Sequence, residues 1–208
     1  VAEIKRDAKG KVLAISTDVR EESSVISSIN KVKDEFGKID ILVNNAGTSS
    51  ASPLEEMTNE QLTEDLNLKV YGAIFCARAV IDDMKSNGSG SIINITTPGG
   101  KATAGGSQPT SLSRAAGISL TKAWSKEYAS QNIRVNTVNP SPIETEMIYR
   151  LEDVRNPDRG NTQPMADATP LRRYGQPEEV ARLMLFLGSE DGAFCTGGVY
   201  MCDGGVSA

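Results

Sequence analysis

The sequence predicts an α/β fold: a doubly wound parallel sheet with helices on both faces, formed by a single domain of 208 residues. Short runs rich in Val and Ile alternate along the chain with longer stretches of helical periodicity. Strands that are separated by helices favour crossover connections, and crossovers make neighbouring strands parallel. Small, amide and hydroxyl residues follow several of the apolar runs, at the sheet edge where this class of fold binds ligands.

The strands are predicted from short runs of apolar and β-branched residues. They fall at residues 11–16, 39–43, 91–97, 133–138 and 197–201. The second run leads into Asn44-Asn45-Ala46-Gly47, whose small residues and amides permit close approach by a ligand or by neighbouring backbone. The third ends in Thr96 and Thr97 before a Pro-Gly-Gly turn, so these hydroxyls are candidate site groups. Capping of that turn is the alternative role for them.

The helices are predicted from apolar residues that recur on one helical face, and from their start and stop signals. They fall at residues 1–8, 21–36, 58–85, 109–130 and 177–187. Gly10 and Gly37 stand at stop positions, and Pro177 opens the last helix at its favoured first position. Prolines punctuate residues 142–173, a connection of the length expected for a substrate loop or lid.

Composition excludes several classes of function. The net charge of −5 comes without a basic patch, so nucleic acid is not an expected partner. No apolar run is long enough to span a bilayer and the N-terminus shows no signal core, so we expect a cytoplasmic protein without membrane contact. The chain has no histidine, and its 3 cysteines lack metal-ligand spacing, so no metal site is expected. Acid-base chemistry must therefore use Tyr, Lys, Cys or a carboxylate.

A series of motifs along the whole chain resembles the short-chain dehydrogenase/reductase family. They are Asp18-Val19, Asn44-Asn45-Ala46-Gly47, the strand at 91–97, the helix segment at 114–122, the strand at 133–140, Gly-Gln-Pro-Glu-Glu-Val-Ala at 175–181 and Asp203-Gly204-Gly205. The last two are most similar to the branch of 3-oxoacyl-carrier-protein reductases. The resemblance implies a Rossmann-like fold and NAD or NADP as cofactor.

The family's first βαβ unit, with its glycine-rich turn for the cofactor pyrophosphate, is absent from this sequence. We expect an N-terminally incomplete domain, because a sheet that lacks its central strand has an exposed edge. A pyrophosphate site formed by another segment is the alternative.

The catalytic motif also departs from the family pattern. The resemblance places Thr97 at the Ser position that binds the substrate carbonyl, Thr110 at the Tyr position and Arg114 at the Lys position. Lys69 stands at the position of the Asn that holds a relay water, or Asn67 if the match is shifted by two residues. An aliphatic hydroxyl is a far weaker acid than a phenol, and Arg stays charged. Lys69 is therefore the candidate acid, if burial near Arg114 lowers its pKa, and a solvated lysine is the alternative.

The resemblance also assigns residues to the cofactor. Asp18 and Val19 would border the adenine, and Arg114 would hold a ribose. The adenosine ribose side would be Asn44, Ala46 and Gly47, and the nicotinamide end would be Pro140, Ser141, Ile143 and Thr145. Ser141 replaces the family's usual Gly. A purely structural role, pairing backbone groups between strands, is the alternative for Asn44 and Asn45.

These motifs and their departures from the family pattern leave two candidate functions. One is an NAD(P)-dependent oxidoreductase that interconverts a secondary alcohol and a ketone with substituted catalytic residues. The other is a non-catalytic relative that acts as an oligomeric binding or regulatory module. The resemblance implies a homodimer or homotetramer, with the helices at 58–85 and 109–130 at one interface.

Overall fold

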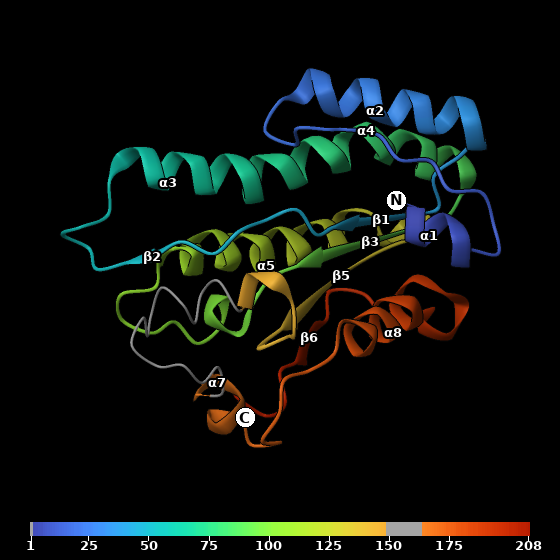
Figure 1. The fold of residues 1–208 in the computed structure, drawn as a ribbon. Coiled ribbons are helices and arrows are strands. Elements are labelled where there is room, and N and C mark those ends of the chain that lie inside the picture. Colours follow the sequence, from blue (N-terminus) through green and yellow to red (C-terminus); the bar gives the residue numbers. More distant parts are fainter. Residues whose placement is uncertain (1, 149–163) are drawn as a thin grey trace.

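A computed structural model describes residues 2–148 and 164–208, and the predicted α/β class is confirmed (Figure 1). The main sheet has four parallel strands in the order β1-β3-β5-β6. Their bounds are Ile41–Asn44, Gly90–Ile95, Ile133–Pro140 and Val199–Cys202. Of the predicted lid at residues 142–173, residues 149–163 lie outside the described residues, and the described part contains the short helix α7 (Pro164–Ala168).

Helices cover both faces of this sheet, as predicted. The remaining helical bounds are α1 (Ala2–Asp7), α2 (Glu22–Phe36), α3 (Asn59–Leu66), α4 (Gly72–Asn87), α5 (Thr110–Glu127) and α8 (Pro177–Gly188). Ile92 packs with side chains of α2, α4 and α5, whereas the next residue, Ile93, packs with α8 on the other face. This alternation follows from the two-residue period of a strand.

The prediction of a strand at residues 11–16 is wrong. These residues form no ladder with any strand in the described part of the chain, so only four of the five predicted strands are in the sheet. A strand needs a neighbouring backbone for its hydrogen bonds, and β1 pairs on one side alone, with β3. Two alternate side chains of β1, which share one face of the sheet, are exposed, at 46% for Ile41 and 40% for Val43.

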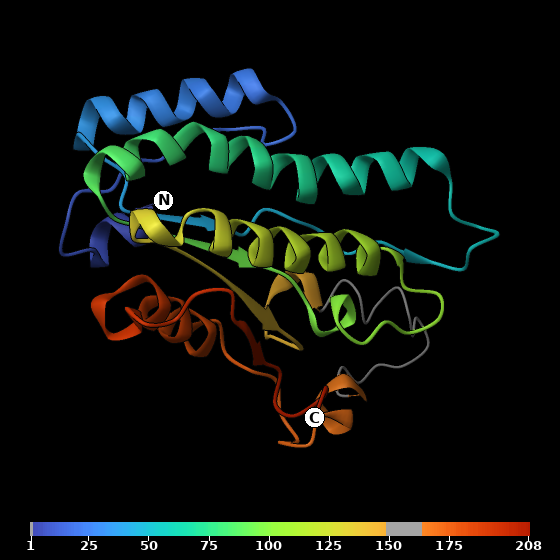
Figure 2. The same cartoon turned by 180° about the vertical axis from the view of Figure 1, so that it is seen from behind.

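The predicted helix at 58–85 contains a local irregularity. Residues Asn67–Tyr71 form a π-helical turn, η1, that joins α3 to α4 in one long helix running beside α5 (Figure 2). Short 3-10 turns occur at Pro98–Gly100 (η2), Ala129–Gln131 (η3) and Glu190–Gly192 (η4). A two-residue ladder pairs β2 (Ala51–Ser52) with β4 (Gln108–Pro109). None of these short features has a periodicity that could predict it.

Arg134 on β5 holds the end of α8. Its Nη1 donates to the carbonyls of Leu187 at 2.6 Å and Gly192 at 2.9 Å, and its Nη2 donates to that of Ser189 at 3.1 Å. Carbonyls at a helix C-terminus have no partner within the helix, and a cation there is favourable.

We expect Arg134→Met to lower the free energy of unfolding by about 3 kcal/mol, because several buried carbonyls lose a charged donor at once. Urea unfolding followed by circular dichroism measures the change. Arg78→Met is the control, since 69% of the Arg78 side chain is exposed and its carboxylate partner lies 3.8 Å away. Equal stability of the two variants would contradict the assigned role of Arg134.

Candidate functional site

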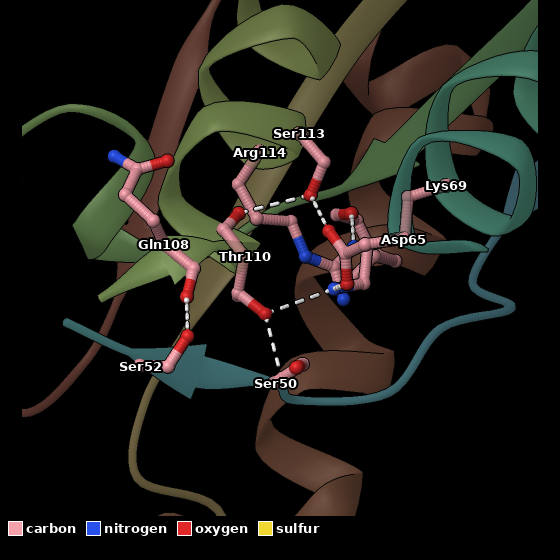
Figure 3. A network of polar contacts seen from close by, with 9 residues as sticks. Ser50, Ser52, Asp65, Lys69, Gln108, Thr110, Ser113 and Arg114 are labelled. Carbon is pink, nitrogen blue, oxygen red and sulfur yellow. Dashed lines mark hydrogen bonds and ion pairs between the residues drawn. The ribbon is translucent and has the colours of Figure 1, made fainter. Parts of the chain in front are cut away.

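A cluster of polar side chains lies where the start of α5 meets the π-helical turn (Figure 3). It contains Lys69, Thr110 and Arg114, which are three of the predicted catalytic residues, together with Asp65, Ser113 and the backbone of Ser50. A π-helical turn inside an α-helix is frequent at functional sites, because the wider turn redirects side chains. Here the turn carries Lys69.

Lys69 is buried, with 2% of its side chain exposed, so the alternative of a solvated lysine is wrong. Its ammonium donates to Asp65 Oδ1, one helical turn earlier, and to Thr110 Oγ1 at 3.0 Å. Burial lowers the pKa of Lys69, the Asp65 carboxylate raises it, and the charge of Arg114 lowers it further. The net direction is downward, which is the condition on which the acid role of Lys69 depends.

Thr110 has both lone pairs of its hydroxyl oxygen occupied. The oxygen accepts one hydrogen bond from Lys69 and another from the Ser50 amide at 2.9 Å. The Thr110 amide in turn donates to the Ser50 carbonyl, next to the short β2-β4 ladder, so this segment fixes the position of the side chain. Within the described residues the Thr110 hydroxyl donates to no acceptor, which leaves its proton free for a ligand.

Arg114 is 9% exposed and reaches the carboxyl end of β3, where its Nη1 donates to the Ile95 carbonyl at 2.6 Å. Its Nε is buried and has no hydrogen-bond partner in the described part of the chain. Burial lowers the pKa of Arg114, and Asp65 opposes that shift. Gly47 leaves room for the guanidinium, because a Cβ there would lie 2.7 Å from Nη2.

Two hollows adjoin the cluster. A cleft of about 520 Å³ is lined by Asp18, Val19 and Ala46 of the predicted cofactor residues, and by Asp65. A cavity of about 30 Å³, large enough for a water molecule, is lined by Lys69 and Arg114, with Asn44 and Ala46. The structure therefore brings together predicted residues that follow or end β1, those of residues 18–19, and Lys69 and Arg114.

Two of the predicted residues that line these hollows also make contacts within the fold, and a further predicted group lines neither hollow. The Asn44 amide donates to the side-chain oxygen of Asn94 on the neighbouring strand at 2.9 Å, which is a contact between side chains and not the backbone pairing of its structural alternative. Asp18 is paired with Arg20, whose guanidinium lowers the pKa of Asp18 to about 2. A final group lines neither hollow and follows β5: Pro140, Ser141, Ile143 and Thr145.

The two adjacent threonines at the end of β3 differ in role. Thr96 is buried and hydrogen-bonds to Thr137 and Asn139, which is a structural role. Thr97 is partly exposed, and its hydroxyl makes no hydrogen bond within the described residues. The following turn, η2, packs against the backbone of Arg114 at Gly100. Thr97 thus keeps a hydroxyl available near the start of α5.

Asp65, Ser113 and Ser50 were not predicted as site residues. Asp65 and Lys69 do carry a sequence signal, since opposite charges four residues apart share a helix face. Ser113 and Ser50 carry none, because their contacts depend on how distant segments pack. Among the described residues no group of His, Cys, Asp and Glu could hold a metal, and no helix is long and apolar enough to cross a membrane.

Comparisons with known proteins agree with the α/β fold of this chain. The model of the family described as Enoyl-(Acyl carrier protein) reductase matches residues 1–207. The 3-oxoacyl-[acyl-carrier-protein] reductase FabG of Thermotoga maritima is 35% identical over 197 residues, which are 95% of this chain and 78% of that protein. The crystal structure of levodione reductase superposes with a TM-score of 0.94 at 27% identity, covering 99% of this chain and 81% of that one. The structure of NAD⁺-bound xylitol dehydrogenase superposes with a TM-score of 0.84 at 28% identity, covering 92% of this chain and 78% of that one.

Proposed function

Because this chain belongs to the short-chain dehydrogenase/reductase family, as a member similar to 3-oxoacyl-carrier-protein reductases, we propose that it interconverts a secondary alcohol and a ketone with NAD or NADP. The named relatives act on an oxoacyl group, a dione and a polyol, and these substrates have such a carbon centre in common. The finer proposal concerns how this chain moves the proton without the family's Tyr and Lys.

The observation that carries the proposal is the hydrogen bonding of Thr110. Two N–H donors, one of them cationic, occupy its oxygen and polarise the O–H bond. In reduction, the Thr110 hydroxyl gives its proton to the carbonyl oxygen while it takes one from the Lys69 ammonium. Thr110 is therefore a relay, and Lys69 is the acid. General acid catalysis of this kind contributes about 10²- to 10⁴-fold in rate. The hydroxyl of Thr97 would hold the same carbonyl oxygen.

The residues present fit a nicotinamide cofactor. The cleft beside Asp18, Val19 and Ala46 has the volume typical of a small-molecule site. The unpartnered Nε of Arg114 is a buried donor that a ribose hydroxyl can satisfy. A nicotinamide bound there would supply or accept the hydride at the carbonyl carbon. The roles of Asn44, Gly47, Pro140, Ser141, Ile143 and Thr145 at this cofactor, and the homodimer or homotetramer, stay predictions.

Calorimetric titration of this chain with NADH and NADPH is the first test, followed by turnover on a panel of ketones that includes a 3-oxoacyl thioester. We expect micromolar binding of at least one cofactor and reduction of at least one ketone. Binding without any turnover would favour the non-catalytic relative. Absence of both would overturn the proposal for this chain.

A further inference from the structure

We propose that Asp65 is the positioning residue of this site: its carboxylate fixes the direction of the hydrogen bond between Lys69 and Thr110, so that the Thr110 proton faces the substrate. This inference rests on the proposed function, since it assigns a role to Asp65 through the other two residues. Neither the family motifs nor the predicted site residues include Asp65.

Asp65 contacts Lys69 directly and is linked to Thr110 through Ser113. Its Oδ1 accepts from Lys69, and its Oδ2 accepts from the Ser113 hydroxyl at 2.5 Å. Ser113 lies one turn after Thr110 on α5, and its hydroxyl oxygen lies 2.9 Å from the Thr110 carbonyl, which shares the hydroxyl's single proton with Asp65. Asp65 therefore joins the helix that carries the ammonium to the helix that carries the hydroxyl (Figure 3). Only 2% of its side chain is exposed, so solvent does not compete for these contacts.

The charge of Lys69 decides which partner donates. An ammonium has three donors and no lone pair, so Thr110 can only accept from it. A neutral amine has a lone pair to which the Thr110 hydroxyl can donate, and that donation turns its proton away from the substrate. The observed arrangement is useful for reduction only while Lys69 stays charged.

Asp65 is the group that favours the charged form. Burial and the Arg114 guanidinium on α5 both lower the pKa of Lys69, whereas Asp65 on α3 raises it. Cys76 on α4 lines the same cavity, and burial raises the pKa of its thiol, so it adds no negative charge near neutral pH. Among the described residues that line the cavity or bond to Lys69, Asp65 is the only carboxylate.

The sign of the pH dependence follows from these shifts. Lys69 is protonated below its pKa and loses its proton as the pH rises through it. Removal of the Asp65 charge lowers that pKa, so the ammonium is lost at a lower pH. The rate of ketone reduction should therefore fall over the pH interval in which the Lys69 ammonium loses its proton.

The test compares Asp65→Asn with the wild-type chain and with Glu60→Gln, which removes an exposed carboxylate from the same helix. Nuclear magnetic resonance of ¹⁵N- and ¹³C-labelled lysine follows the charge of Lys69 against pH, and Lys69→Arg assigns its signal. We expect the Lys69 titration to move to lower pH in Asp65→Asn alone. The kcat for ketone reduction should fall about 100-fold where that variant has lost the ammonium, and recover at lower pH.

Each outcome separates the inference from its premise. An unmoved Lys69 titration, or a kcat that falls equally at every pH, would overturn the positioning role. A titration that moves while the wild-type chain reduces no ketone would overturn the proposed function and keep the assignment of Asp65 to the charge of Lys69. If Asp65→Asn does not fold, the wild-type spectrum decides: a neutral amine signal from Lys69 at neutral pH would overturn the inference, and a protected ammonium would support it.

Discussion

Replacement of Thr110 by Val is expected to lower the kcat for ketone reduction by about 10²- to 10⁴-fold, with little change in the binding of NADH or NADPH. Valine keeps the branched shape of threonine and removes the hydroxyl that accepts from Lys69. Substrate and cofactor can still enter the site, but the proton of Lys69 has no route to the carbonyl oxygen. Steady-state kinetics and calorimetry measure the two effects separately.

Thr110→Ser is the matched control for this prediction, because serine keeps the hydroxyl that bonds to Ser50 and Lys69. We expect it to retain kcat within about tenfold of the wild-type value. Equal losses in the Val and Ser variants would indicate that the methyl group or local packing matters, and would refute the relay. Full activity in Thr110→Val would place proton transfer elsewhere.

The fold could be predicted because its main signals are local. Apolar periodicity located four strands of the sheet and the long helices, and Gly37 and Pro177 stand at helix ends as their backbone preferences require. The prediction of a strand at residues 11–16 was wrong because a strand depends on a neighbour elsewhere in the fold. Its residues have suitable propensity, but a ladder needs a partner strand, and no described strand lies beside them. Propensity describes one segment and not its neighbours.

The candidate site was predictable in part, and only through the family resemblance. The matched motif positions pointed to Lys69, Thr110 and Arg114, and the structure groups these three. The burial of Lys69 and its partner Asp65 depended on a π-helical turn that no sequence pattern signals. Ser113 and the Ser50 backbone enter the site through packing between segments far apart in the chain. These long-range contacts determine what the substituted residues can do.

Lys69→Met is expected to abolish reduction and also to lower the free energy of unfolding by about 3–5 kcal/mol. Removal of the ammonium leaves the Asp65 carboxylate buried without its cationic partner, although Ser113 still donates to it. Loss of turnover in this single variant therefore has two sources. Urea unfolding and steady-state kinetics must be measured on the same protein.

The double variant Asp65→Asn/Lys69→Met separates these two sources. It removes both members of the buried ion pair, so the uncompensated charge disappears and most of the lost stability should return. Activity should not return, because the double variant still lacks the acid that supplies the proton. A stable double variant that reduces ketones at the wild-type rate would mean that Lys69 serves only the fold. A stable and inactive one would separate the chemical role of Lys69 from its structural role, which the single variant cannot do.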